Sequence, residues 1–170
     1  NDFTINDFTA DYLLSNEDRQ GKLSVKEKIT LTFRDYNHGI LRAIPKEYKN
    51  NSIKLTIKSV KRDGADEPYT TYDQNDNLIL KIGDANKTIN NQHVYEISYE
   101  VSNVIRFYDN HDEFYWDING DQWGQPFQHV RMNLSFADGL ETDGQLTCFT
   151  GSYRSSAQSC EIGEIDGKVI

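Results

Sequence analysis

The sequence predicts an all-β fold, built as an antiparallel β-sandwich with little helix. Apolar residues recur at every second position in several segments, and turn-forming residues separate these segments. No window longer than about ten residues shows the 3.6-residue period of an amphipathic helix. Many short strands with frequent turns are typical of a sandwich, so we expect a layout that is immunoglobulin-like in general architecture.

The clearest predicted strand covers residues 23–33. The side chains that share one face of this strand are Leu23, Val25, Glu27, Ile29, Leu31 and Phe33, whereas Ser, Lys and Thr occupy the positions between them. This is the pattern of a strand with one buried face. The same period predicts further strands over 53–57, 95–101 and 130–136.

Turn signals lie between and after these segments. Asp-Gly and Asn-Gly pairs and one Asn/Asp-rich run favour the tight turns of β-hairpins. They are Asp63-Gly64, Gln74-Asn75-Asp76-Asn77, Asn119-Gly120, Asp138-Gly139, Asp143-Gly144 and Asp166-Gly167. The stretch 40–49 allows one helical turn, which Pro45 would interrupt.

Length and charge narrow the classes of function. The 170 residues suit one domain over 1–170 with a sizeable core. The formal net charge is −9 and no basic stripe offsets it, so we expect no nucleic-acid partner. The apolar runs are far shorter than the roughly 20 residues that span a bilayer. Because the chain begins at Asn1, we expect that a signal has been removed or that the chain was cut from a longer one.

Two cysteines, Cys148 and Cys160, end a Gly/Ser-rich stretch that can bend back on itself. A disulfide that closes this loop fits both the number and the spacing of the cysteines. The rival interpretation is a nucleophilic thiol, which would need a histidine and an orienting partner and would leave the second cysteine unexplained. We favour the disulfide, and with it an oxidising, extracytoplasmic location.

The sequence lacks the familiar signatures of catalytic sites. It contains no HExxH, GxSxG, P-loop or GxGxxG motif, and its histidines are scattered. Asp117, Asn119 and Asp121 alternate oxygen ligands as calcium loops do, but Gly120 stands fourth in that run instead of sixth. A hairpin turn through Asn119-Gly120 explains the same residues. We therefore expect no metal and no cofactor, and favour a role without catalysis.

The segment 107–127 is the predicted binding surface. It combines aromatic residues, acids, a proline and an Asn-Gly turn, a mixture that suits recognition better than a core strand. The candidate binding residues are Tyr115, Trp116, Asp117, Asn119 and Trp123. A hairpin would place the two tryptophans near each other on its arms, with at least one partly exposed. The alternative is that both lie inside the sandwich, where tryptophan is usually well buried.

A second interpretation of this segment is carbohydrate chemistry. Pairs of carboxylates can flank a glycosidic bond, and tryptophans can serve as sugar platforms. The acids are Asp109, Asp112, Glu113 and Asp117, and the platforms would be Trp116 and Trp123. Acidic pairs are also common on the solvated loops of a chain with many carboxylates, so both interpretations stay open.

Glu27 is the one charged residue on the apolar face of the clearest strand. A buried carboxylate needs a cation or several hydrogen-bond donors, because its desolvation would otherwise be costly. Arg42 follows soon enough in the chain to fold over it. We predict that Glu27 and Arg42 form a buried pair with a structural role.

Three stretches together resemble the YciQ-like family of predicted bacterial membrane proteins (domain-of-unknown-function family 2207). The first is 23–33 followed by 38–45, whose Val25, Glu27, Gly39, Arg42 and Pro45 resemble the family's V-x-E strand and Gly-Ile-x-Arg-x-Ile-Pro turn. The second is 95–105 leading to 113–130, which resembles its Tyr-Trp-Asn/Asp segment. The third is 148–160. These stretches cover most of the chain.

The resemblance implies a soluble ectodomain of a membrane-anchored parent chain, and it implies no reaction. We therefore expect a non-catalytic binding or assembly module on the extracytoplasmic side of a bacterial membrane, with a protein or an envelope glycan as a partner. The alternative is a carbohydrate-active or glycan-binding domain that acts on the cell envelope through the acids and tryptophans of 109–123.

Overall fold

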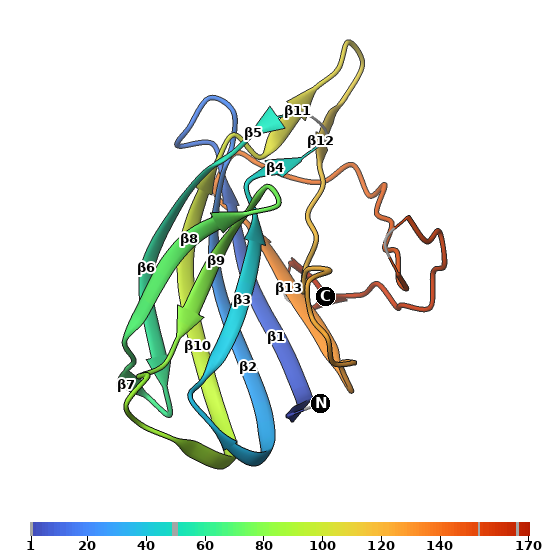
Figure 1. The fold of residues 1–170 in the computed structure, drawn as a ribbon. Coiled ribbons are helices and arrows are strands. Elements are labelled where there is room, and N and C mark those ends of the chain that lie inside the picture. Colours follow the sequence, from blue (N-terminus) through green and yellow to red (C-terminus); the bar gives the residue numbers. More distant parts are fainter. Residues whose placement is uncertain (1, 49–50, 153, 166) are drawn as a thin grey trace.

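The computed structural model describes residues 2–48, 51–152, 154–165 and 167–170. Within these ranges the chain forms strands and loops without a helix, which confirms the prediction of an all-β sandwich. Figure 1 shows the layers: β3, β8 and β9 lie in front of the longer strands β2, β6 and β10. No helix in the described ranges is long and apolar enough to cross a bilayer.

The larger sheet contains eight strands in the order β14-β15-β13-β1-β2-β10-β6-β7. Their bounds, in chain order, are β1 Phe3–Ser15, β2 Lys22–Asn37, β6 Lys54–Arg62, β7 Ala65–Asp66, β10 Ile89–Ser102, β13 Val130–Phe136, β14 Glu164–Ile165 and β15 Lys168–Val169. Neighbours in this sheet are antiparallel except β1 and β13, which run parallel. The sequence did not predict the parallel pair.

The facing sheet has three strands in the order β3-β9-β8. The strands are β3 Ile40–Pro45, β8 Tyr69–Gln74 and β9 Asn77–Ile82. Two short pairs lie apart from both sheets: β4 Glu47–Tyr48 with β5 Asn51–Ser52, and β11 Ile105–Phe107 with β12 Asp112–Phe114. After β13 the chain makes a wide excursion on one side of the sandwich before β14 (Figure 1).

The core lies between the two sheets and follows the predicted alternation. All six inward positions of 23–33 are at most 3% exposed, including Glu27. The inward residues of β10 are buried in the same way. In β13 the alternation is weaker, because Leu134 is buried but Val130 is 43% exposed.

The stretch 40–49 is not helical in its described part, so the allowance for a helical turn was wrong. Ile40, Arg42 and Ile44 alternate inward in β3, and β3 pairs with β9 along its whole length. Gly39 precedes this strand at a φ of +137°, and a Cβ there would lie 1.9 Å from the Ile82 carbonyl oxygen. Only glycine permits so close an approach of two backbones. Lys49 lies outside the described residues.

The predicted turns have mixed outcomes. Asp63-Gly64 joins β6 to β7, and Asn75-Asp76 joins β8 to β9, each with positive φ at both central residues as tight hairpin turns require. The hairpin expected at Asn119-Gly120 is wrong, because the nearest strands, β12 and β13, end and begin several residues away. Asp166 of the last predicted turn lies outside the described residues.

Candidate functional site

A buried ion pair lies at the centre of the site. Arg42 on β3 reaches across the sandwich to Glu27 on β2, and its Nε and Nη2 donate to Oε2 and Oε1 of the carboxylate at 2.9 and 2.7 Å. Both residues are 1% exposed. Burial disfavours a charged guanidinium, but the Glu27 carboxylate outweighs this effect and raises the pKa of Arg42. The predicted pair is therefore present, with the bidentate geometry of strong arginine–carboxylate contacts.

Two aromatic residues complete the surroundings of this pair. The Tyr99 hydroxyl on β10 donates to Glu27 Oε1 at 2.6 Å. Burial, and then the Glu27 charge, raises the pKa of Tyr99 well above its ordinary value, so the phenol keeps its proton. The Arg42 guanidinium lies 5.7 Å from the centre of the Phe8 ring on β1. Both charges are thereby solvated by protein groups.

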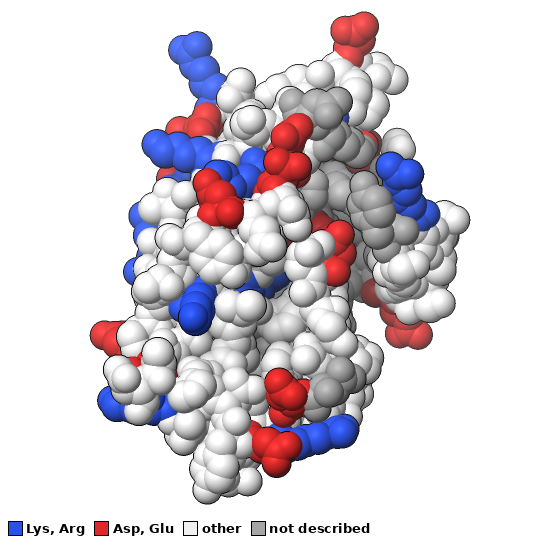
Figure 2. All heavy atoms as spheres, in the orientation of Figure 1, with Lys and Arg blue, Asp and Glu red and all other residues white. Residues whose placement is uncertain are grey.

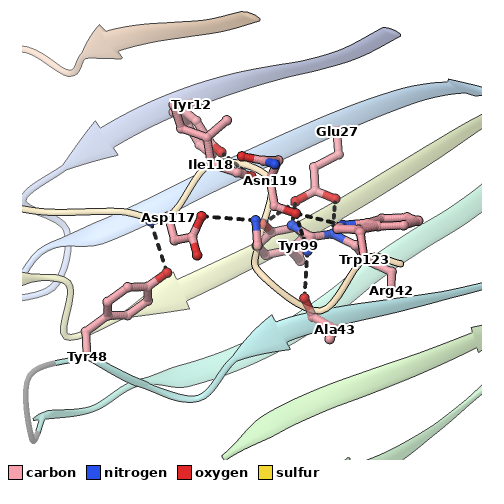
Figure 3. Close-up of polar contacts among 11 residues, drawn as sticks. Tyr12, Glu27, Arg42, Ala43, Tyr48, Tyr99, Asp117, Ile118, Asn119 and Trp123 are labelled. Atoms are coloured by element: carbon pink, nitrogen blue, oxygen red, sulfur yellow. Dashed lines mark hydrogen bonds and ion pairs between the residues drawn. The ribbon is translucent and has the colours of Figure 1, made fainter. Parts of the chain in front are cut away.

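Arg42 also holds the loop 115–123 against the sandwich (Figure 3). Its Nη1 donates to the Asn119 carbonyl oxygen at 3.1 Å and to the Ala43 carbonyl oxygen at 2.6 Å. Gly120 has a φ of +76°, and a Cβ there would lie 2.7 Å from Arg42 Nη1. The Asn-Gly turn therefore serves to bring a backbone carbonyl onto a buried cation.

Asp117 and Trp123 stabilise the same turn from its two ends. Asp117 Oδ1 accepts the Gly120 N–H at 3.0 Å, and the Trp123 indole donates to the Asn119 carbonyl oxygen at 2.8 Å. Burial raises the pKa of Asp117, against the lowering effects of the Gly120 hydrogen bond and of Arg42. In the described residues no group of three or more His, Cys, Asp or Glu side chains could hold a metal ion.

The predicted binding residues divide into two groups. Asp117, Asn119 and Trp123 surround the turn on Arg42, whereas Tyr115 and Trp116 lie against Tyr48 of β4, at ring-centre distances of 6.0 and 5.0 Å. Both tryptophans are half-buried, and they contact different aromatic partners. Both therefore remain partly exposed, which confirms the prediction for at least one of them and contradicts the alternative that both lie inside the sandwich. The hairpin that was expected to bring the two together does not form around Asn119-Gly120.

A narrow hollow beside Trp116 has room for about one water molecule. Its volume is about 10 Å³, and Tyr48, Tyr115 and Trp116 form its aromatic side. The Trp116 indole Nε1 is buried, and no hydrogen-bond acceptor reaches it among the described residues.

The hairpin β11–β12 carries two exposed aromatic residues of the segment. Phe107 is 58% exposed and Tyr108 is 45% exposed. The Tyr108 ring stacks on the His111 ring, with 4.8 Å between the ring centres. Arg106 on β11 donates to the Tyr48 carbonyl oxygen at 2.5 Å, which joins the hairpin to β4. Figure 1 shows the hairpin projecting beyond the end of the sandwich. Tyr115, 44% exposed, follows β12.

Cys148 and Cys160 form the disulfide that the sequence favoured, with their Cα atoms 6.3 Å apart. The bridge lies in the excursion after β13, and an isolated pairing of Thr150 with Ala157 narrows the loop that it closes. Phe149, next to the bridge, is 53% exposed. The disulfide therefore constrains a peripheral loop and not the core.

The sequence missed several residues of this site. Tyr99 lies in a predicted strand, two residues before Val101, so the alternation of that strand already predicted that its side chain faces inward. Phe8 belongs to β1, whose own alternation of Phe8, Ala10, Tyr12 and Leu14 was the signal for a strand. Tyr48 had no comparable signal, because its contacts are with residues far away in the chain.

Solved structures share the fold at low sequence identity. M1 zinc metallopeptidase from Deinococcus radiodurans, bound to a Tyr-Ser-Ala substrate, matches with a TM-score of 0.50 and 11% identity over 98% of this chain and 38% of that one. Native yeast LTA4 hydrolase matches with a TM-score of 0.51 and 10% identity over 79% of this chain and 23% of that one. At such identities the likeness concerns the fold alone.

The chain is also similar in sequence to a known protein and to a protein family. The uncharacterized protein YciQ of Escherichia coli (strain K12) is 24% identical over an alignment of 158 residues that covers 88% of this chain, and the chain spans 25% of the length of that relative. Residues 4–165 match the family described as "Predicted membrane protein (DUF2207) N-terminal domain". The predicted resemblance is thereby confirmed, and the chain belongs to this family of membrane protein N-terminal domains.

Proposed function

We propose that this chain is a non-catalytic binding or assembly module on the extracytoplasmic side of a bacterial membrane protein. The observation that carries the proposal is the projecting hairpin β11–β12 with its exposed aromatic residues Phe107 and Tyr108. Exposed aromatic residues on a supported loop are typical of recognition surfaces. The family supports a membrane-anchored parent chain as the first partner.

The hairpin has the support that a recognition surface needs. Arg106 fixes β11 to β4, and the loop that follows β12 is held by Arg42 through the Asn119 carbonyl oxygen. A surface held in its bound geometry loses less conformational entropy on association. Asp109 and Asp112 lie at the exposed end of the hairpin, so we expect a partner with basic groups around an apolar contact.

The disulfide supports the extracytoplasmic side, because such bonds persist in oxidising compartments. Alkylation of the denatured, unreduced protein purified from its native membrane should label neither Cys148 nor Cys160. For sidedness, a Tyr36→Cys variant of the full-length protein should react with a membrane-impermeant maleimide in intact spheroplasts, since Tyr36 is 73% exposed. Labelling only after lysis would place the domain on the cytoplasmic side and overturn this part of the proposal.

The glycan-processing alternative needs a pair of carboxylates that face a common space. Asp117 accepts the Gly120 N–H, and no carboxylate lines the hollow beside Trp116 or the hollow that Tyr72 and Gln122 line. Trp116 and Trp123 have part of their faces packed on other aromatic rings. We therefore place binding ahead of catalysis for this segment.

A photo-crosslinker tests the recognition surface. p-Benzoylphenylalanine at position 107 or 108 of the full-length membrane protein, irradiated in cells, should give discrete crosslinks to another part of the parent chain or to a protein partner. The same group at position 36 is the matched control, because Tyr36 is also an exposed aromatic residue but lies on β2. Equal yields of crosslinks from all three positions, or none from 107 and 108, would contradict the proposal.

A further inference from the structure

A second hollow, of about 130 Å³, lies on the outer face of the three-stranded sheet. The residues that line it come from all three strands, from the β8–β9 turn and from the loop 115–123: Leu41, Ala43, Tyr72, Gln74, Asn75, Ile79 and Gln122. The volume exceeds the roughly 10–15 Å³ that one water needs. The space suits a single-ring ligand.

The strand register determines the floor and the walls of this hollow. Ala43 and Tyr72 both pair with Ile79, so the three side chains form one row across the outer face of β3, β9 and β8. Ala43 and Ile79 are 8% and 7% exposed and form an apolar floor, whereas Tyr72 and Leu41 are 43% and 54% exposed and stand at its sides. An apolar floor beside an accessible aromatic ring suits the flat C–H face of a ring ligand.

The polar part of the lining consists of amides. Gln74 ends β8, Asn75 begins the turn to β9, and Gln122 arrives from the loop that Arg42 holds. The Gln122 amide donates to Asp121 Oδ1 at 2.8 Å, which orients it. Amide groups both donate and accept hydrogen bonds, so they can match hydroxyl groups, which do the same.

No side chain that lines the hollow carries a formal charge. Figure 2 shows the front face, which β3, β8 and β9 present, as mostly uncharged, with acids and bases scattered over it. An ionic ligand would find no counter-charge in the lining. A purely apolar ligand would leave three amides without partners, which is costly for groups removed from water.

We propose that this hollow is a binding site for a neutral saccharide ring. A pyranose offers one apolar face for Tyr72 and Leu41 and equatorial hydroxyl groups for the amides of Gln74, Asn75 and Gln122. The site uses neither the hairpin β11–β12 nor its aromatic residues. Failure of this proposal and failure of the proposed recognition surface are therefore distinguishable.

Titration of the ¹⁵N-labelled domain tests the site. Maltotriose and chitotriose, added separately up to tens of millimolar, should shift the backbone amide signals of Tyr72, Ile79 and Gln122 in a saturable way for at least one of the two sugars. Tyr72→Ala should raise the Kd about tenfold through loss of the stacking surface. Gln122→Ala should weaken binding without a change elsewhere in the spectrum.

Tyr36→Ala is the matched control, because it removes another exposed tyrosine that does not line the hollow. It should leave the Kd for the sugar within about twofold of the wild-type value, a change in binding free energy well below that of a specific contact. No saturable shift with either sugar would overturn the proposal. Shifts that persist unchanged in Tyr72→Ala would also overturn it. Saturable shifts of the same signals by a neutral tripeptide, without any by the sugars, would show that the site takes peptide instead.

Discussion

Arg42 is the side chain on which the arrangement of the site depends most. Its Nε and Nη2 donate hydrogen bonds to the Glu27 carboxylate, and its Nη1 donates to two backbone carbonyl oxygens, one of which belongs to the loop 115–123. A lysine would supply the charge but not this planar fork of donors. A single buried residue thus links the core to the segment that carries the predicted binding residues.

Arg42→Met should destabilise the fold by about 3 to 5 kcal/mol, because it leaves the Glu27 carboxylate buried without a cation. The double variant with Glu27→Gln should recover part of this loss, since a neutral amide is less costly to bury and can still accept the Tyr99 hydroxyl. Urea unfolding of the wild type, both single variants and the double variant measures the coupling. Additive losses would show that the two residues do not interact.

Gly120→Ala tests the close approach of the turn to Arg42. The positive φ alone should cost about 1 to 2 kcal/mol in a residue with a Cβ, and the 2.7 Å contact with Nη1 should add to this cost. The Trp123 indole, bonded to Asn119, should become more accessible to acrylamide.

Two glycines serve as controls for this variant. Gly144 has a φ of +84° but no neighbour within 4 Å of a Cβ, so Gly144→Ala measures the conformational cost alone. Gly124 has neither a positive φ nor such a neighbour, and Gly124→Ala should change little. If Gly120→Ala costs no more than Gly144→Ala, the contact with Arg42 contributes nothing.

Among the elements, the turn between β6 and β7 has its own polar cluster. Asp63 accepts the Val94 N–H at 2.9 Å and lies 2.6 Å from His93 Nδ1. Burial raises the pKa of Asp63, but the Val94 hydrogen bond and His93 outweigh it and hold the pKa below the ordinary value. The carboxylate therefore joins this turn to β10.

Asp63→Asn should weaken this link in a pH-dependent way. Because the folded-state pKa of Asp63 is the lower one, its charge stabilises the fold fully above the unfolded-state value of about 3.9, and the contribution is lost as pH falls through the folded-state pKa. Urea midpoints should therefore differ between wild type and variant at pH 7 and converge as the pH falls below the folded-state pKa of Asp63. A difference that stays constant with pH would exclude the charge as its cause.

Strand β13 covers the edge of β1 in the larger sheet. It lies parallel beside β1, in register from Phe8↔Val130 to Leu14↔Phe136, although these strands are far apart in the chain. Leu134 enters the core from it, and β15 pairs with it through Val169. We therefore expect 1–170 to unfold as one cooperative unit, in which residues beyond the candidate site complete the core.

A chain that ends at Gln128 should fail to fold, because removal of β13 to β15 exposes the edge of β1 and the buried side chains beside it. The loss of one buried leucine costs about 2 to 5 kcal/mol, against a total of about 5 to 15 kcal/mol for a typical domain. Near-ultraviolet circular dichroism and NMR dispersion measure the outcome. A chain that ends at Leu140 keeps β13 and should fold with reduced stability. Native-like spectra for the shorter chain would refute the single unit.

Much of the fold could be predicted because strand alternation is a local property. The inward face of β2, including Glu27, and that of β10 follow from a period of two, whatever strand lies alongside. The pairing of Glu27 with Arg42 also followed, because a buried carboxylate requires a cation and Arg42 follows the strand soon enough to fold over it. The disulfide followed from the number of cysteines and their spacing.

The neighbours of each element depended instead on contacts between distant residues. A parallel partner for β1, an Arg42 that holds the Asn119 carbonyl oxygen, and a hollow shared by Tyr72 and Gln122 leave no mark in any short window of sequence. Several neighbouring strands or loops would satisfy the same local pattern equally well, so which neighbour packs against an element depends on how the whole chain buries its apolar surface. Local chemistry therefore determines which face of a strand is buried, and packing of the complete chain determines what lies against it.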